Sequence, residues 1–291
     1  MIHEKAYAKI NLGLQVLNKR DDGYHNLKSI MTTIDLHDDL FIGIHNDIIV
    51  DCDKPVCRQE DNLVYKVAVL MHKKYNVKKG TKIHIGKNIK VGGGLAGGST
   101  NAAAAIRGLD KLWGLNLSYN DMYEIAKVIG SDVTFCIQGG LATVSERGDI
   151  INPLPYELDF YIVLVYPTYS NLTVNIFKSY QPNHDNNNSK YDDLYWEVIT
   201  NDVHNYAKYL FNDLETTVDS MHFSNKNTNI LSIKKNLLEA GCLGAVMTGS
   251  GSTVYGLVDN FDDARNIAQK LKRIYPNYNV DVTHSKRKAL T

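Results

Sequence analysis

A glycine-rich stretch at residues 92–98, followed by four alanines, constrains this chain more than any other feature of its sequence. Five of the seven residues in the stretch are glycine, so the backbone can turn sharply and approach a ligand without a Cβ in the way. Ser99 or Thr100 can cap a helix, and alanines 102–105 favour that helix. A helix that begins directly after such a loop directs free N–H groups and a positive dipole end at one point, which suits a phosphate group.

Two common phosphate-binding patterns do not describe this loop. The P-loop pattern requires Gly-Lys-Ser/Thr, which the stretch does not contain. Gly92, Gly94 and Gly97 match the dinucleotide pattern G-x-G-x-x-G, but the helix predicted at 101–113 leads into a second helix, and Asp110 lies inside the first. The sequence therefore argues against a nicotinamide site. Another kind of phosphate site and a flexible loop without a ligand both remain open.

Length and charge limit the classes of protein to consider. A chain of 291 residues exceeds one ordinary core, so we expect two domains, 1–155 and 156–291, divided near Pro153-Leu154-Pro155. Lysine plus arginine and aspartate plus glutamate both number 32, which gives no basic excess for nucleic acid or membrane binding. The first residues carry no apolar signal region, and the four cysteines form no CxxC pair. We expect a cytoplasmic protein with reduced thiols.

Hydrophobic patterning predicts an α+β fold with largely antiparallel sheets. The strands are predicted at 8–16, 27–34, 81–85, 141–145, 161–165, 245–248, 253–258 and 280–282. The helices are predicted at 62–75, 101–113, 121–129, 203–218, 230–240 and 262–274. The polar stretch 181–193 is predicted to be a surface loop, and Ser118-x-x-Asp121 to be a capping box.

Polar residues on the first predicted strand form a second candidate group. Alternation places Ile10, Leu12, Leu14 and Val16 on one face and Lys9, Asn11, Gly13 and Gln15 on the other. Taken alone, Lys9 is read most simply as a solvent-exposed lysine on a half-buried strand.

Two further segments carry alternatives of the same kind. Asp132 follows Gly130, which ends a predicted helix, and stands beside an apolar run, so it could be a capping carboxylate. The segment 248–253, Thr-Gly-Ser-Gly-Ser-Thr, lies between two predicted strands. It could be a simple turn, or a second glycine loop that faces the first.

Together these segments resemble the GHMP kinases, the superfamily of galactokinase, homoserine kinase, mevalonate kinase and phosphomevalonate kinase. Residues 6–12 match the first motif of that family, residues 92–103 the second, which is its phosphate loop, and residues 246–252 the third. The resemblance implies a two-domain α+β fold, with a ribosomal protein S5 domain 2-like N-terminal domain and a ferredoxin-like C-terminal domain.

Finer features resemble the members that act on a cytidine-diphosphate-linked polyol in isoprenoid precursor synthesis. These features are Gly23-Tyr24-His25 and the segments 61–66, 130–135 and 212–215. The resemblance covers nearly the whole chain and is weakest at 181–205. It implies ATP and Mg²⁺ as cofactors, a small-molecule acceptor, no nucleic acid or membrane partner, and a monomer or homodimer.

The resemblance also implies roles for single residues. Asp132 would accept the proton of the acceptor hydroxyl, and Lys9 would hold that carboxylate ionised and lower the pKa of the hydroxyl. Ser99 would lie near the β- and γ-phosphates and Mg²⁺. The ATP-binding loop would comprise Lys90, Val91, Gly92, Gly93, Gly94, Leu95, Ala96, Gly97, Gly98, Ser99 and Thr100.

At the cytidine end, Tyr24 and Phe177 would sandwich the pyrimidine ring and His25 would read its edge. Asn11 and Thr173 match positions that hold the polyol or its diphosphate. A core role for Phe177 is the alternative, because its alignment crosses a variable stretch.

The chain departs from the family pattern at three positions where proline is usual: Lys90, Thr134 and Ser252. Loss of the first proline removes a rigid approach to the glycine loop, and Lys90 could contact a nucleotide phosphate or be solvated. Two other functions stay open: a GHMP kinase for another small alcohol, such as homoserine or a mevalonate derivative, and a non-catalytic nucleotide-binding paralogue.

Overall fold

A computed structural model describes residues 1–54, 56–181, 189–222 and 229–286. The strands are β1 (Ile2–Lys19), β2 (His25–His45), β3 (Ile48–Cys52), β4 (Gly80–Gly86), β5 (Leu141–Glu146), β6 (Ile150–Pro153), β7 (Tyr161–Tyr166), β8 (Phe211–Asn212), β9 (Gly244–Met247), β10 (Val254–Val258) and β11 (Asn279–Lys286). The helices are α1 (Leu63–Lys74), α2 (Gly97–Trp113), α3 (Tyr119–Ile129), α4 (Ser131–Gln138), α5 (Thr173–Ser179), α6 (Ser189–Thr200), α7 (Val203–Tyr206), α8 (Glu215–Met221), α9 (Ile230–Ala240) and α10 (Phe261–Ile274).

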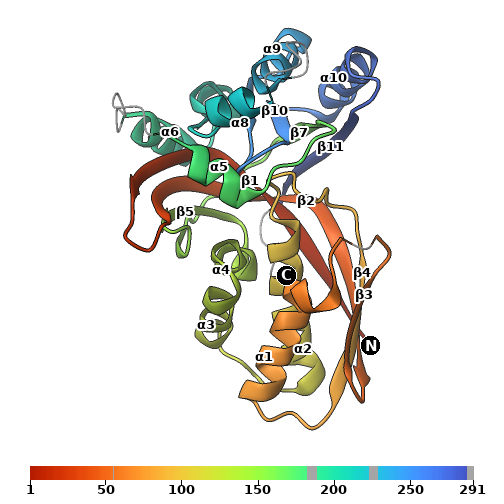
Figure 1. Ribbon diagram of the computed structural model, residues 1–291. Coiled ribbons are helices and arrows are strands. Elements are labelled where there is room, and N and C mark those ends of the chain that lie inside the picture. Colours follow the sequence, from red (N-terminus) through yellow and green to blue (C-terminus); the bar gives the residue numbers. More distant parts are fainter. Residues whose placement is uncertain (55, 182–188, 223–228, 287–291) are drawn as a thin grey trace.

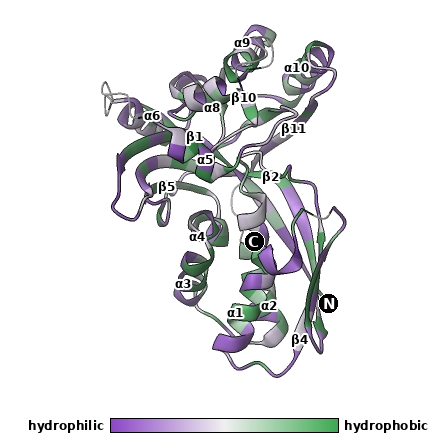
Figure 2. Ribbon diagram, viewed as in Figure 1, coloured by the Kyte–Doolittle hydropathy of each residue, from purple (hydrophilic) through white to green (hydrophobic). Residues whose placement is uncertain are grey.

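The strands form one connected sheet system in the order β3-β4-β2-β11-β7-β10-β9, with β1 and β5 also paired to β2. All pairings are antiparallel except β1 with β8 and β3 with β4, so the predicted antiparallel character is confirmed. Helices α1 to α4 pack on one side of the long strands β1 and β2, and the helices α5 to α10 lie with β7, β10 and β11 on the other (Figure 1). Figure 2 shows that hydrophobic and hydrophilic residues alternate along the helices and strands, as expected of amphipathic elements.

The two halves of the chain are joined by strand pairing. Strand β11, from the end of the chain, pairs with β2 through Ser285 and Lys286 and with β7 through the rest of its length. Strand β8 adds to β1 opposite Gly13 and Leu14. The division at residue 155 stays a prediction. Among the described residues, no helix combines the length and apolar character needed to cross a bilayer.

Residues 8–16 of β1 are buried on both faces, so the interpretation of Lys9 as a solvent-exposed lysine is wrong. The side chain of Lys9 is 4% exposed, so this lysine is not on a solvated face. Ile10 and Leu12 pack in one hydrophobic cluster, whereas Leu14 and Val16 pack in the other. The pairing of β1 with β2 shifts register between Asn11 and Gly13. An irregularity of this kind redirects the following side chains, so the four apolar residues do not share one face.

Three predictions about secondary structure are wrong in whole or in part. Helix α2 begins at Gly97 after Ala96 in a left-handed conformation (φ 58°), so neither Ser99 nor Thr100 caps it, and Thr100 Oγ1 instead donates to the carbonyl of Tyr7. The stretch 203–218 is not one helix. Asn212 interrupts it by donating to the carbonyls of Met247 and Gly249, both at 2.8 Å.

The third wrong prediction is that of a surface loop over the polar stretch 181–193. Residues 189–193 belong to α6, and 182–188 lie outside the described residues. The sequence patterns also did not predict the short elements β3, β6, α4 and α5. The capping box at Ser118 and Asp121 is confirmed.

Candidate active site

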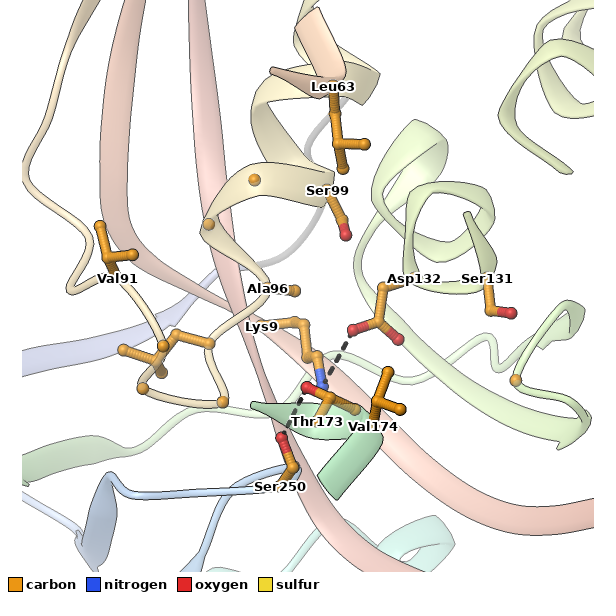
Figure 3. A pocket seen from close by; sticks show the side chains of 18 of the residues that line it. Lys9, Leu63, Val91, Ala96, Ser99, Ser131, Asp132, Thr173, Val174 and Ser250 are labelled. Atoms are coloured by element: carbon orange, nitrogen blue, oxygen red, sulfur yellow. Dashed lines mark hydrogen bonds and ion pairs between the residues drawn. The ribbon is translucent and has the colours of Figure 1, made fainter. Parts of the chain in front are cut away.

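The main cavity has a volume of about 840 Å³ and is lined by residues from both halves of the chain. Figure 3 shows Lys9 and Asp132 pointing toward one another beside the glycine loop, with Thr173 and Ser250 next to them. The glycine loop and the catalytic candidates Lys9 and Asp132 line the cavity. The substrate-binding candidates Asn11, Tyr24, His25 and Phe177 line it as well. Residues more than 230 positions apart therefore meet in one place.

The glycine loop takes conformations that require glycine at two positions. Gly92 and Gly94 have φ values of 67° and 78°, in the left-handed region. A Cβ at Gly94 would overlap the carbonyl oxygen of Thr248 and lie 3.1 Å from the amide nitrogen of Gly251. The loop therefore owes its shape to close packing against the segment 248–253.

That segment is both a turn and a second loop facing the first. Within it, the amide of Gly251 donates to the carbonyl of Thr248 at 3.0 Å. Across the contact, the amide of Thr253 donates to the carbonyl of Gly93 at 3.2 Å. Both alternatives from the sequence, a turn and a second loop that faces the first, therefore hold for this segment. The start of α2 lies at this junction, and its first N–H groups have no partner within the helix, so they can bind an anion.

Lys9 and Asn11 form a buried polar pair beside the loop, and the partly exposed carboxylate of Asp132 lies next to it. The ammonium nitrogen of Lys9 donates to Asn11 Oδ1 at 2.8 Å and lies 3.6 Å from Asp132 Oδ2. Asn11 Oδ1 also accepts from the amide of Gly249 at 3.1 Å, and its amide nitrogen donates to Ser29 Oγ at 2.8 Å. Asn11 therefore orients the lysine and holds the third motif against the first.

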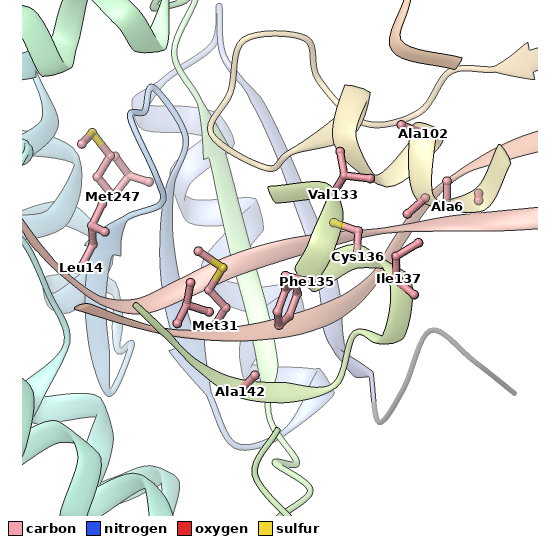
Figure 4. Close-up of a cluster of buried hydrophobic side chains, with 14 of the residues drawn as sticks. Ala6, Leu14, Met31, Ala102, Val133, Phe135, Cys136, Ile137, Ala142 and Met247 are labelled. Carbon is pink, nitrogen blue, oxygen red and sulfur yellow. The ribbon is translucent and has the colours of Figure 1, made fainter. Parts of the chain in front are cut away.

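Asp132 owes its position to α4. It stands in the first turn, where the helix dipole favours a carboxylate, and its side chain is 37% exposed toward the cavity. The rest of the helix is anchored by buried apolar residues that pack near Ala102, Met31 and Ala142 (Figure 4). Those buried residues are Val133, Phe135, Cys136 and Ile137. A carboxylate on a rigid helix end faces Lys9 without being buried, which suits proton transfer.

Aromatic residues gather at another end of the cavity. Tyr24 is 58% exposed, and His25 is 8% exposed with its ring centroid 5.9 Å from that of Phe177. His25 Nδ1 is buried without a hydrogen-bond partner among the described residues. Phe177 packs partly on the hydrophobic core and also lines the cavity, so the core and site interpretations both hold in part. This end, called the aromatic slot below, combines the rings of Tyr24, His25 and Phe177 with charged lining residues such as Asp22 and Arg147.

Burial, together with the charge of Lys19, lowers the pKa of His25 below its ordinary value of 6.5. The neutral ring is therefore favoured in the folded protein, and its stabilising contribution is present above about pH 6.5. We expect the affinity for a cytidine diphosphate diester to stay constant from about pH 8 to 6.5 and to weaken below it. Calorimetric titration across this range, with His25→Gln as the control, measures this. A loss of affinity above pH 6.5 that is abolished in the variant would contradict it.

Helix α5 is tied to the third motif. Thr173 Oγ1 lies 2.9 Å from Ser250 Oγ, and Asn171 donates to the carbonyl of Ser250 at 3.2 Å. Thr173 faces the cavity, as the sequence analysis expects of a substrate-binding residue. These bonds place Phe177, about one helical turn later, at the aromatic end.

The three positions without proline are each held by hydrogen bonds. Lys90 donates to the carbonyl of Pro167, and burial lowers the pKa of its ammonium group. Ser252 Oγ donates to the carbonyl of Tyr169 at 2.6 Å, and Thr134 Oγ1 to the carbonyl of Ser131 at 2.5 Å. Lys90 is thus neither freely solvated nor loose, and side-chain bonds take the place of the rigid ring.

Sequence reasoning missed several lining residues. They are Cys52, Val56, Asn62 and Leu63 at the end near α1, and Ser131 and Arg147 near the aromatic end. Asn62, Leu63 and Ser131 lie in segments 61–66 and 130–135, which the resemblance singled out without giving these residues a role. Cys52 ends β3, and Val56 and Arg147 lie outside helices and strands, so their place in the cavity depends on the tertiary fold.

Comparison with known proteins defines the class. The family model for the GHMP kinases N terminal domain matches residues 62–140, and that for the GHMP kinases C terminal domain matches residues 197–277. The chain belongs to the GHMP kinase family.

Particular relatives narrow this class. The chain is 39% identical to a 4-diphosphocytidyl-2-C-methyl-D-erythritol kinase of Clostridium perfringens, over 97% of each chain. It is similar in fold to a crystal structure of 4-(cytidine 5'-diphospho)-2C-methyl-D-erythritol kinase (TM-score 0.80, 24% identity, 98% of this chain and 99% of the other). It is also similar to homoserine kinase from Cytophaga hutchinsonii (TM-score 0.73, 17% identity, 99% and 95%). The fold alone therefore does not select the acceptor.

Proposed function

We propose that this chain transfers the γ-phosphoryl group of ATP to the 2-hydroxyl of 4-diphosphocytidyl-2-C-methyl-D-erythritol, a step toward isoprenoid precursors. The observation that carries the proposal is one cavity in which the Lys9–Asp132 pair lies between a phosphate-binding loop and the aromatic slot of Tyr24, His25 and Phe177. The names of the relatives at about 40% identity support the same acceptor. We also propose two domains divided at residue 155, a cytoplasmic location, and action as a monomer or homodimer.

In this proposal the main-chain amides of residues 90–100 hold the ATP phosphates. The N-terminus of α2 adds its dipole, and the apolar end near Val56 and Leu63 takes the adenine. Phosphoryl transfer depends mainly on positioning and on charge neutralisation, which backbone amides supply without rearrangement.

Asp132 accepts the proton of the acceptor hydroxyl as the hydroxyl oxygen bonds to the γ-phosphorus. The bond from the γ-phosphorus to the β,γ-bridging oxygen breaks, and ADP leaves. Lys9, whose ammonium nitrogen lies 3.6 Å from Asp132 Oδ2, stabilises the carboxylate before transfer and would stabilise the alkoxide of an acceptor bound against Asp132. The side-chain oxygen Oδ1 of Asn11 accepts a hydrogen bond from Lys9 and holds the lysine in place. In this proposal Asn11 therefore acts on the acceptor chiefly through Lys9.

The residues present fit a Mg²⁺ ion bound together with ATP. Mg²⁺ in kinases keeps several waters and uses one or two protein oxygens with the substrate phosphates. The hydroxyl of Ser99 faces the cavity and would supply such an oxygen. Bound there, the ion would neutralise charge on the β- and γ-phosphates.

The aromatic slot takes the cytosine. Tyr24 and Phe177 offer ring faces for stacking, and the unpartnered Nδ1 of His25 can bond the base edge. Neither homoserine nor mevalonate carries a base that could fill this slot.

An ADP-release assay with three acceptors tests the proposal: the cytidine-linked methylerythritol, homoserine and mevalonate. We expect turnover with the first only. Turnover with homoserine or mevalonate would assign a different acceptor. ATP binding without turnover on any of the three would indicate a binding protein.

His25→Ala is expected to raise KM for the cytidine substrate about 5- to 100-fold, because a buried hydrogen bond to the base is lost. KM for ATP should change less than about twofold, since the ATP loop lies elsewhere in the cavity. His204→Ala, which removes an exposed histidine outside the cavity, is the control. Equal loss for both substrates would contradict base reading by His25.

A further inference from the structure

Two turns meet beside the aromatic end of the cavity. One joins β1 to β2 and carries Tyr24, and the other joins β5 to β6 and carries Arg147. Strand pairing brings the turns together, with Leu27 opposite Glu146. Arg20 of the first turn also donates to Glu146 at 2.7 Å. Both Tyr24 and Arg147 line the cavity.

The guanidinium carbon of Arg147 lies 5.5 Å from the centre of the Tyr24 ring. The Nη2 group of Arg147 donates to Asp149 Oδ2 at 3.1 Å, and Asp149 is 7% exposed. The guanidinium is therefore held in place by a nearly buried carboxylate. A planar cation stacks on an aromatic face and is attracted to it.

Tyr24 would otherwise be a mobile surface side chain, because 58% of it is exposed. If the Tyr24 ring must become ordered when the base binds, the affinity for the base falls. A ring already held in place avoids that cost. A cation on one face of the ring leaves the opposite face for stacking.

We propose that Arg147 is a positioning residue for the cytidine end of the acceptor: Asp149 holds Arg147, Arg147 holds the Tyr24 ring, and the free ring face stacks on the base. This inference rests on the proposed function, since it names a determinant of the same substrate site. It assigns Arg147 an effect through Tyr24 rather than a direct contact with the diphosphate.

A double-mutant cycle tests this. Arg147→Met is expected to raise KM for the cytidine substrate about 3- to 10-fold, with kcat and KM for ATP changed less than about twofold. In the Tyr24→Leu background, the same substitution should change KM less than about 1.5-fold, because the ring it acts on is gone. The pair Arg147→Met with Asp149→Asn removes the unpaired carboxylate and should give the same KM as Arg147→Met alone.

Lys127→Met is the matched control, because Lys127 also lies over a tyrosine ring, at 5.8 Å from Tyr123, outside the cavity. It should leave both KM values unchanged. Effects of Arg147 and Tyr24 that multiply independently would overturn the proposal in favour of direct phosphate binding, and an unchanged KM in Arg147→Met would overturn it outright. Binding of CDP itself distinguishes failure of the proposed function from failure of this inference. A wild-type protein that does not bind CDP contradicts both. Equal CDP binding by the wild type and Arg147→Met contradicts this inference alone.

Discussion

Asp132→Ala is expected to lower kcat by about 10²- to 10⁴-fold while ATP binds as before, because the variant loses the group that accepts the hydroxyl proton. The carboxylate stands at the start of α4 and faces Lys9 at 3.6 Å, away from the packed face of the helix. The variant should fold, since the apolar residues that anchor α4 are unchanged. Single-turnover phosphoryl transfer and calorimetric ATP titration measure the two effects separately.

Asp132→Asn sharpens this test, because the amide keeps the shape of the side chain and cannot accept the proton. It should be as inactive as Asp132→Ala. Asp262→Ala is the control, an acidic residue in the first turn of α10 and outside the cavity. Residual turnover within about tenfold of wild type in either Asp132 variant would rule out its role as the base.

Gly94→Ala is expected to have the second large effect, on stability and on ATP binding together. At φ 78° an alanine costs about 1–2 kcal/mol in backbone strain. Its Cβ would also overlap the carbonyl of Thr248, which adds about 1–3 kcal/mol of overpacking. KM for ATP should rise at least about tenfold, because the loop that holds the phosphates must shift. Denaturant unfolding and ATP kinetics are the measurements.

Gly114→Ala is a matched control for the strain. Gly114 also has a positive φ, 63°, but no heavy atom lies within 4 Å of the Cβ that an alanine would add. It should cost about 1–2 kcal/mol and leave KM for ATP unchanged. Equal losses of stability in the two variants would show that the contact between the glycine loop and residues 248–253 is not what shapes the site.

Local sequence patterns located the parts of the fold that local physics controls. The capping box at Ser118 and Asp121 depends on neighbours in the chain and was predicted correctly. The strands were placed correctly, but β1 (Ile2–Lys19) and β2 (His25–His45) extend well beyond the predicted 8–16 and 27–34. The start of α2 was misplaced because a non-glycine residue, Ala96, takes the left-handed conformation there. A left-handed alanine is uncommon, so the local sequence gives no reason to expect one there.

The burial of Lys9 was not accessible from the residues alone. An alternating strand predicts one solvated face, but here β1 has packing on both sides, and a register shift redirects Leu14 and Val16. Only the family resemblance gave Lys9 and Asp132 roles, and the structure shows them side by side. Arg147 escaped prediction because its partner Tyr24 is more than 120 positions away, on another turn.

The most direct test is a crystal structure with the cytidine-linked methylerythritol and a non-hydrolysable ATP analogue, in which the distance from Asp132 to the acceptor is measured. We predict the 2-hydroxyl about 2.6–3.2 Å from the carboxylate and about 3–3.5 Å from the γ-phosphorus, with the cytosine stacked on Tyr24. A hydroxyl beyond reach of Asp132, or a base bound outside the slot of Tyr24, His25 and Phe177, would contradict this assignment.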